Sequence, residues 1–128
     1  MSMMDYCETP TGRNPKQIKA MRERLNALAF IRATVPPCEL WAQLAEEATE
    51  LAHAALKLRR ATGVDNPTPV EPGDAFGQVM EEIADVTLLI HVLQLDTTPD
   101  ALRAGMDYKL LRWRGRLEGK EEKESTET

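Results

Sequence analysis

The sequence predicts an all-α protein, a four-helix bundle-like domain that assembles into a helical oligomer. Apolar residues recur at helical spacing in four successive stretches, and Pro- or Gly-containing breaks separate these stretches. No stretch shows a convincing strand alternation. With 128 residues, 42% of them hydrophobic and 29% charged, the chain fits one ordinary globular domain.

The first helix is expected over residues 14–33, after a flexible leader at residues 1–13. Asn14 can cap this helix, and Pro15 suits its first position. Pro36 and the proline that follows it end the helix. Its apolar stripe consists of Ile18, Met21, Leu25, Leu28 and Ala29.

The second helix is expected over residues 39–61, with Gly63 as its terminator. Its apolar residues follow the i, i+3, i+4, i+7 pattern. They are Trp41, Leu44, Ala48, Leu51, Ala55 and Leu58. Residues 62–73 contain three prolines and two glycines, which predict a loop.

The third helix is expected over residues 74–95, with Asp74 as its cap. Between Val86 and Leu93 its apolar residues surround almost the whole helix, a pattern typical of a helix buried on every side. A four-helix monomer can hardly bury such a helix fully. We therefore expect a homodimer, or a homotetramer built from dimers.

The fourth helix is expected to start at Thr98, as cap, and Pro99 and to end near Leu117. Its apolar stripe consists of Leu102, Met106, Leu110, Trp113 and Leu117. Residues 118–128, rich in Glu, Lys, Ser and Thr, are expected to form a disordered charged tail. The folded domain is therefore expected at residues 14–117.

Two acidic pairs on neighbouring helices are the residues that point most clearly to a function. Glu47 and Glu50 are three residues apart on the second helix, and Glu82 and Asp85 are three apart on the third. Residues at this spacing share a helix face, with Cβ atoms roughly 5–6 Å apart. If the two helices face each other, four carboxylates meet, which is costly without a cation.

An acidic pair on a helix is ordinarily solvated surface. Here Glu47 borders the apolar stripe beside Leu58, and Asp85 is followed by Leu89 at i+4 and Val92 at i+7. Oxygen ligands without cysteine or a suitably placed histidine favour a hard ion, so we expect Mg²⁺, with Mn²⁺ as a substitute.

A di-iron site is the alternative interpretation of these acidic residues. Glu50 and His53 form a Glu-x-x-His motif, as in di-iron helical bundles. Those proteins need two such motifs, and His91 has Leu88 three residues before it where a glutamate would be required. We therefore interpret both histidines as structural or solvent-facing.

Charge and cysteine content restrict the class of protein. A net charge of −5 argues against general nucleic-acid binding, which depends on Lys and Arg. Cys7 and Cys38 show no metal-ligand spacing and are read as reduced thiols. Without a signal-peptide pattern or an apolar run that could span a bilayer, the chain is expected to be cytoplasmic and not bound to a membrane.

The two acidic motifs also resemble a known family. Glu-Glu-x-x-Glu-Leu at 46–51 and Glu-Glu-x-x-Asp-Val at 81–86, followed by Leu-Leu-Ile at 88–90, are similar to MazG-like nucleotide pyrophosphohydrolases, members of the all-α NTP pyrophosphatase superfamily. The resemblance covers about residues 39–117. It implies that the paired carboxylates Glu47, Glu50, Glu82 and Asp85 hold Mg²⁺.

The same resemblance implies an activity. A nucleoside triphosphate, ribo or deoxy, would be hydrolysed to the monophosphate and pyrophosphate by water attacking the α-phosphorus, with Glu47 or Glu50 orienting the water. The family often has a basic cluster after the second motif. Here Lys109, Arg112 and Arg116, at i, i+3 and i+7, would bind the phosphates and stabilise the leaving pyrophosphate.

Two alternatives remain open. The chain could act on another nucleotide with the same metal chemistry, as a phosphoribosyl-ATP pyrophosphohydrolase or a dUTPase-like enzyme. It could instead be a catalytically silent helical module that binds a protein partner through its acidic face. The sequence does not indicate base specificity, although Phe30, Trp41, Phe76 and Tyr108 could stack on a base.

Overall fold

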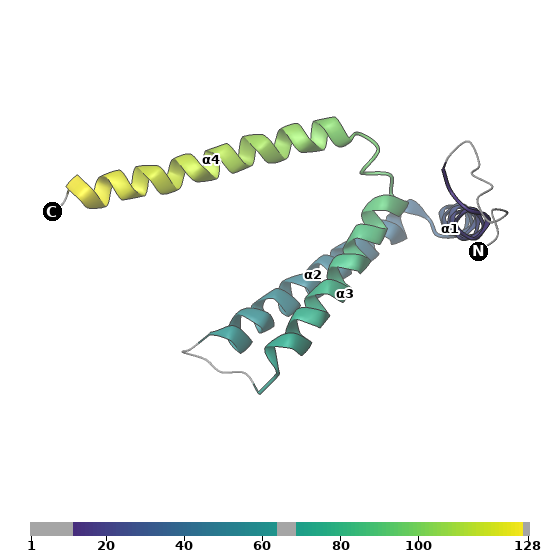
Figure 1. The fold of residues 1–128 in the computed structure, drawn as a ribbon, viewed down its shortest axis with the longest axis horizontal. Coiled ribbons are helices and arrows are strands. Elements are labelled where there is room, and N and C mark those ends of the chain that lie inside the picture. Colours follow the sequence, from purple (N-terminus) through teal and green to yellow (C-terminus); the bar gives the residue numbers. More distant parts are fainter. Residues whose placement is uncertain (1–11, 64–68, 127–128) are drawn as a thin grey trace, which may run out of the picture. The chain divides into compact units, whose positions relative to one another are not determined.

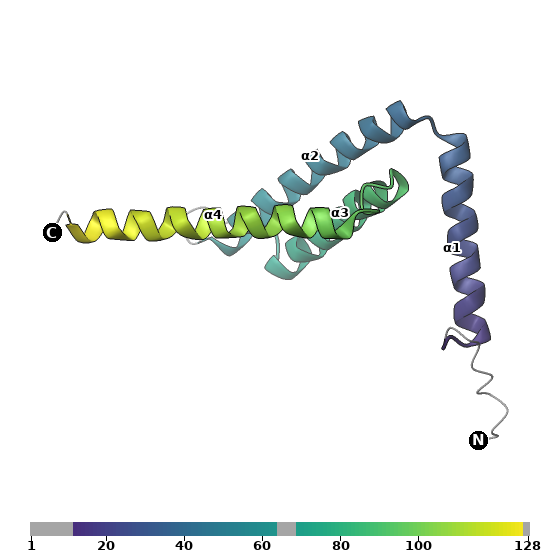
Figure 2. The same ribbon diagram turned by 90° about the horizontal axis from the view of Figure 1, so that it is seen from above.

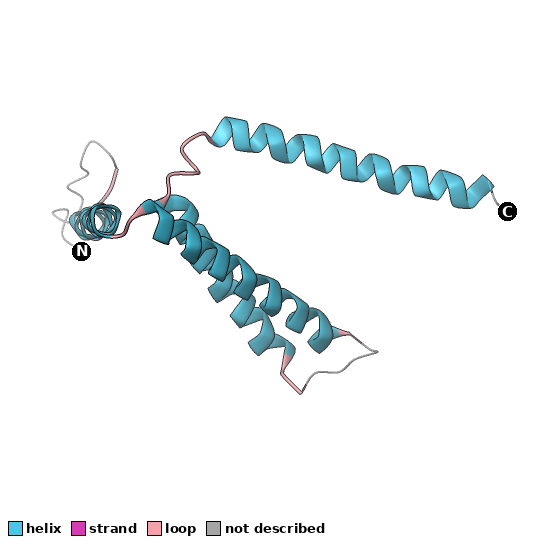
Figure 3. Ribbon diagram, turned by 180° about the vertical axis from the view of Figure 1, so that it is seen from behind, coloured by secondary structure: helices cyan, strands magenta, loops and turns pink. Residues whose placement is uncertain are grey.

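The computed structural model describes residues 12–63 and 69–126, with side chains up to residue 119. These residues form four α-helices and, within the described ranges, no strand (Figures 1 and 3). The helices are α1 (Pro15–Thr34), α2 (Pro37–Thr62), α3 (Pro72–Val92) and α4 (Pro99–Thr126). The all-α prediction is therefore confirmed. The chain divides into two compact units, one ending at Leu93 and the other starting at Gln94.

The start of α1 is a capping box. The Asn14 side chain accepts a hydrogen bond from the Gln17 backbone N–H at 2.9 Å, and the Asn14 N–H donates to the Gln17 side chain at 3.0 Å. Pro15 occupies the first turn, where its missing N–H has no cost. The helix ends at Thr34, so both predicted ends are confirmed to within one residue.

Proline fixes the starts of α2 and α3. Pro37 begins α2 two residues earlier than predicted. The prediction that Asp74 caps the third helix is wrong, because Pro72 already lies in the first turn and Glu71 is the cap. A proline ring presets the helical φ, which here outweighs the capping preference of an aspartate. Asp74 lies in the first turn, where the helix dipole favours its charge.

The end of α3 falls at Val92, three residues before the predicted Leu95. Gln94 adopts φ 60°, in the left-handed region, and this conformation stops the helix. At the other end of the hairpin, residues 64–68 of the predicted Pro-rich loop lie outside the described residues, as does the predicted leader up to residue 11.

The helices α2 and α3 lie side by side as a hairpin (Figures 1 and 2). A small core joins α1 to the end of this hairpin at which α2 begins and α3 ends. Its buried residues are Leu28, Leu40, Leu89 and Val92, and partly buried Ile31, Val35, Leu44 and Leu93 pack against them. Burying these side chains holds the first unit together.

Arg32 of α1 clamps the C-terminus of α3. Its Nε donates to the Val92 carbonyl at 2.9 Å, and its Nη2 donates to the His91 carbonyl at 2.8 Å. The last carbonyls of a helix lack intrahelical donors and carry partial negative charge, so a guanidinium suits this position.

The apolar residues of α3 lie on two different faces of the helix. Leu89 and Val92 are buried within the chain against α1 and α2. Leu88 is 51% exposed, and Phe76, Met80 and Ile83 are exposed as well. Part of the apolar surface of α3 is thus buried without a second subunit, and the rest faces solvent in the single chain.

The start of α4 at Pro99 agrees with the prediction, but its end does not. The helix continues through Glu118 to Thr126, where a disordered tail was expected. Glu and Lys are good helix formers, so a composition that permits disorder also permits a solvated helix. The side chains that were predicted to form its apolar stripe, Leu102, Met106, Leu110, Trp113 and Leu117, are all exposed.

The structure also bears on the cysteines and on the expected absence of a membrane-spanning helix. Cys38 is a free, exposed thiol, whereas Cys7 lies outside the described residues. Within the described part of the chain, no helix combines the length and the apolar character needed to cross a membrane.

Candidate functional site

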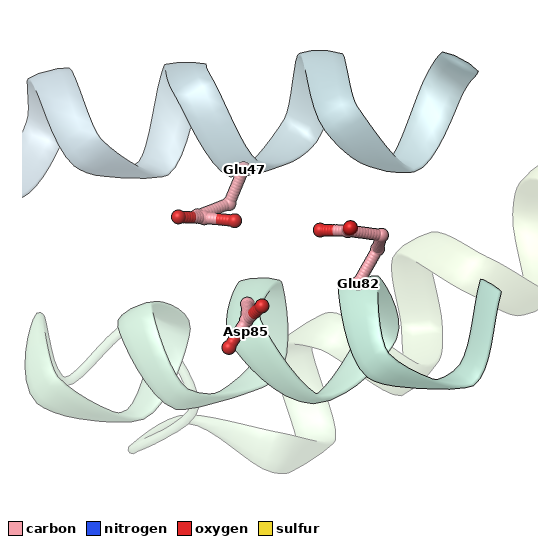
Figure 4. A group of neighbouring side chains, drawn as sticks. All are labelled: Glu47, Glu82 and Asp85. Carbon is pink, nitrogen blue, oxygen red and sulfur yellow. The ribbon is translucent and has the colours of Figure 1, made fainter. Parts of the chain in front are cut away.

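Three of the four predicted carboxylates come together between α2 and α3. Glu47 projects from α2, and Glu82 and Asp85 project from α3 towards it (Figure 4). One ligand-capable oxygen from each residue lies within 4.8 Å of the other two. The pairing of the two helices therefore brings one predicted acidic motif opposite the other.

The three carboxylates differ in burial. Glu82 is 9% exposed, Glu47 is half-buried and Asp85 is exposed. The Gln78 amide donates a hydrogen bond of 2.6 Å from Nε2 to the Glu82 Oε1 atom, one helical turn away. This donor supports the buried carboxylate without bringing a charge of its own. The cluster thus has a buried inner carboxylate and an accessible outer one.

The electrostatics of the cluster act most clearly on Glu47. Partial burial, which disfavours the charged form, raises the pKa of Glu47 above its ordinary 4.5, and the negative charges of Asp85, Glu82, Glu50 and Glu46 raise it further. A cation placed among the three carboxylates would favour the ionised form of Glu47.

Few cations lie near the cluster in the sequence. Residues 36–56 contain four carboxylates and residues 69–93 contain five, with no lysine or arginine in either segment, and the cations of α2, which are Lys57, Arg59 and Arg60, lie at its C-terminal end. Among the described residues, no ion pair joins Glu47, Glu82 or Asp85 to a basic side chain. No described basic side chain therefore neutralises the cluster by direct contact.

The donor set fits a hard divalent ion. Carboxylate oxygens bind Mg²⁺ at about 2.0–2.1 Å, so oxygens sharing one ion lie about 3–4 Å apart. The observed 4.8 Å limit is within reach of side-chain rotation. Glu47, Glu82 and Asp85 could hold such an ion together with waters and ligand oxygens.

Glu50 lies one turn beyond Glu47 on α2 and is exposed. It is not among the three residues whose oxygens converge, but its charge contributes to the raised pKa of Glu47. The structure therefore brings together three of the four predicted ligands and leaves the fourth beside them. His53 on the same helix is exposed, and the converging group contains no histidine.

The predicted phosphate-binding residues form a basic stripe on α4. Lys109, Arg112 and Arg116, which we call the basic stripe, border a shallow groove together with Trp113 and Leu117. Arg114 points to another part of the helix surface, where its Nε lies 2.7 Å from the Glu118 Oε1 atom. Among the described residues, Arg114 is therefore already paired with a carboxylate, unlike the three residues of the basic stripe.

Comparisons of the chain with protein-family models, with curated proteins and with solved structures find no match. The carboxylate cluster and the basic stripe are therefore interpreted from their geometry and chemistry.

Two residues at these places were missed as functional candidates in the sequence. Gln78 precedes Glu82 by four residues, a spacing at which a helical side chain can reach a carboxylate. Trp113 was assigned to an apolar packing stripe, although it lies next to all three basic residues. The i, i+4 spacing was a readable signal for Gln78, and the neighbouring cations were one for Trp113.

Proposed function

We propose that this protein is a Mg²⁺-dependent nucleoside triphosphate pyrophosphohydrolase of the MazG-like type. The observation that carries the proposal is the convergence of Glu47, Glu82 and Asp85 from two helices, with no basic side chain paired to them among the described residues. Three facing carboxylates repel one another in a purely structural surface, whereas in a metal-dependent phosphate enzyme they would hold the ion.

In this proposal Glu47, Glu82 and Asp85 hold the ion, and Glu50 completes the set from the next turn of α2. Mg²⁺, or Mn²⁺ in its place, supplies charge neutralisation at the phosphate oxygens when bound. Glu47 or Glu50 orients the attacking water and accepts its proton. The water oxygen bonds to the α-phosphorus, the bond from that phosphorus to the bridging oxygen breaks, and pyrophosphate leaves.

The basic stripe is assigned to the phosphate groups. Lys109, Arg112 and Arg116 carry charge that can hold phosphate oxygens and stabilise the departing pyrophosphate. Loss of Lys109 or Arg112 is expected to weaken triphosphate binding or slow turnover. Arg114 is the internal control, because its guanidinium is already paired with Glu118.

The test is pyrophosphate release from a panel of ribo- and deoxynucleoside triphosphates with and without Mg²⁺. Glu82→Gln and Asp85→Asn should abolish most Mg²⁺-dependent release while helicity persists, because each removes a ligand charge at nearly constant volume. Glu81→Gln is the matched control, since Glu81 is exposed on the same helix and outside the cluster. Folded Glu82 and Asp85 variants with near-native turnover would remove these residues from the site.

The same panel separates the rival functions. Release only from dUTP or from phosphoribosyl-ATP would identify a more specialised nucleotide hydrolase with the same metal chemistry. No turnover with any nucleotide, together with no heat of Mg²⁺ binding in calorimetry, would favour a silent protein-interaction module.

The proposed enzyme is a homodimer, or a homotetramer of dimers, in the cytoplasm. Support comes from the exposed face of α3, where Phe76, Met80 and Ile83 follow the 4-3 spacing of a helix–helix seam. Ile83→Lys should shift the light-scattering mass towards the monomer, and Glu81→Lys on the same helix should not. A wild-type chain that is a fully active monomer at micromolar concentration would exclude this assembly.

A further inference from the structure

We propose that Trp113 is a stacking surface for a nucleobase, so that α4 binds both the ring and the phosphates of one nucleotide. The inference rests on the proposed function in taking the ligand to be a nucleotide, and it adds a residue that recognises the base. It concerns α4 alone.

Trp113 occupies the border between two kinds of surface. Trp113 is 60% exposed and lines a groove together with the basic stripe. Trp113 also lines a second hollow, whose surface is mainly the apolar carbon of Leu110 and Leu117 and whose remaining residues are the paired Arg114 and Glu118. Trp113 is thus shared between a groove that contains three cations, unpaired among the described residues, and a mainly apolar hollow. A nucleotide combines an anionic group with an uncharged planar ring, and such a border suits it.

The spacing along the helix matches the dimensions of a nucleotide. Lys109 precedes Trp113 by four residues and Arg116 follows it by three, so each lies about one 5.4 Å turn from the indole. A base and its first phosphate are separated by a ribose, a span of the same order. A ring stacked on Trp113 can therefore extend its phosphate to Lys109 or Arg116 without leaving the helix surface.

The charge on this part of α4 is available to a ligand. Residues 108–117 contain four basic side chains and no carboxylate. Only Arg114 has a carboxylate partner among those the structure describes, and this partner is Glu118. Arg112 and Arg116 can bind phosphate by charge-assisted hydrogen bonds, while the electron-rich indole face accepts a stacked base.

The experiment uses the intrinsic fluorescence of Trp113 in the full chain. The protein has two tryptophans, and Trp41→Phe leaves Trp113 as the sole tryptophan, which is excited selectively at wavelengths where tyrosine does not absorb. This variant is titrated with AMP and CMP in EDTA, so that no metal-dependent turnover occurs. Ribose 5-phosphate and inorganic pyrophosphate serve as probes without a base. Saturable quenching by both nucleotides, and by neither of the other two probes, is the expected result.

Matched variants complete the design. Trp113→Phe, which retains only Trp41, should show no saturable quenching. In the Trp41→Phe background, Arg112→Gln should raise the apparent Kd for AMP about tenfold, and Arg114→Gln should leave it within about twofold, since one charged phosphate contact is removed only in the first case. Circular dichroism of each variant establishes that helicity is retained.

The outcomes are separable from those of the proposed function. Equal quenching by ribose 5-phosphate and AMP, or none by any nucleotide, would overturn the role of Trp113 even if pyrophosphate release is observed. Base-dependent quenching that Arg112→Gln weakens would support it even if no nucleotide is hydrolysed, a result that would remove the proposed enzyme and retain the binding surface.

Discussion

The clamp formed by Arg32 gives a prediction whose size follows from the structure. We consider Arg32→Met, which keeps the aliphatic stem of the side chain and removes the guanidinium. The hydrogen bond from Nε to the Val92 carbonyl is partly buried, whereas the bond from Nη2 to the His91 carbonyl is exposed. The two bonds should therefore contribute unequally.

The expected loss is the sum of one strong and one weaker hydrogen bond. A charged, partly buried bond contributes about 1.5–3 kcal/mol, and we assign the exposed one about 0.5–1 kcal/mol because water replaces it readily. Arg32→Met should then lower the free energy of unfolding of the first unit by about 2–4 kcal/mol. In a unit of this size each kcal/mol shifts Tm by about 4–8 °C, so we expect a fall of roughly 8–32 °C.

Thermal unfolding followed by circular dichroism of the full chain is the assay. Arg24→Met is the matched control, because Arg24 is exposed on the same helix and no hydrogen bond from it is described. The control should change Tm by no more than a few degrees. If the free energy of unfolding of Arg32→Met lies within about 0.5 kcal/mol of the wild-type value, the two hydrogen bonds do not hold α1 to the end of α3.

Three further predictions concern the first unit. Asn14→Ala removes the side-chain acceptor of the capping box and should destabilise the protein by about 1 kcal/mol in urea unfolding; no change would exclude a stabilising cap. Leu89→Ala should lower the free energy of unfolding by about 2–5 kcal/mol because it leaves a cavity in the core, whereas Leu88→Ala, at an exposed position, should lower it far less. Equal losses of stability in the two variants would contradict the division of α3 into a buried and an exposed face. The raised pKa of Glu47 means that its contribution to stability is present below pH 4.5 and is lost as pH rises through the raised value. Without divalent ions, Glu47→Gln should therefore raise Tm at pH 7, with the gain vanishing below pH 4.5; a gain that does not depend on pH would refute this account.

Local sequence signals predicted the four helices, but they predicted only some of the helix ends correctly. Asn14 and Pro99 gave correct helix starts because each acts on its own turn. Asp74 failed because two start signals competed, and the fixed φ of Pro72 outweighed the cap. The end of α4 could not be read from composition, since a Glu- and Lys-rich segment suits both helix and solvated coil.

Much of the carboxylate cluster was also predictable. Helical periodicity placed Glu47, Glu82 and Asp85 beside apolar stripes, and packing of α2 on α3 then brought them together. Periodicity did not show that Glu50 would remain outside the converging group, because this depends on the rotation of one helix against another. It likewise could not identify Arg32, whose partners are backbone carbonyls about 60 residues away in the sequence.

The absence of cations from most of the hairpin has a kinetic consequence. Residues 36–56 and 69–93 surround the carboxylate cluster with negative charge, and the field of this charge is screened over about 8–10 Å at ordinary salt. Within this distance of the cluster a free triphosphate is repelled, whereas its magnesium complex carries less negative charge and is repelled less. The charge around the cluster therefore discriminates between the two forms during their final approach, before any contact is made. Added salt should narrow the difference between their association rates.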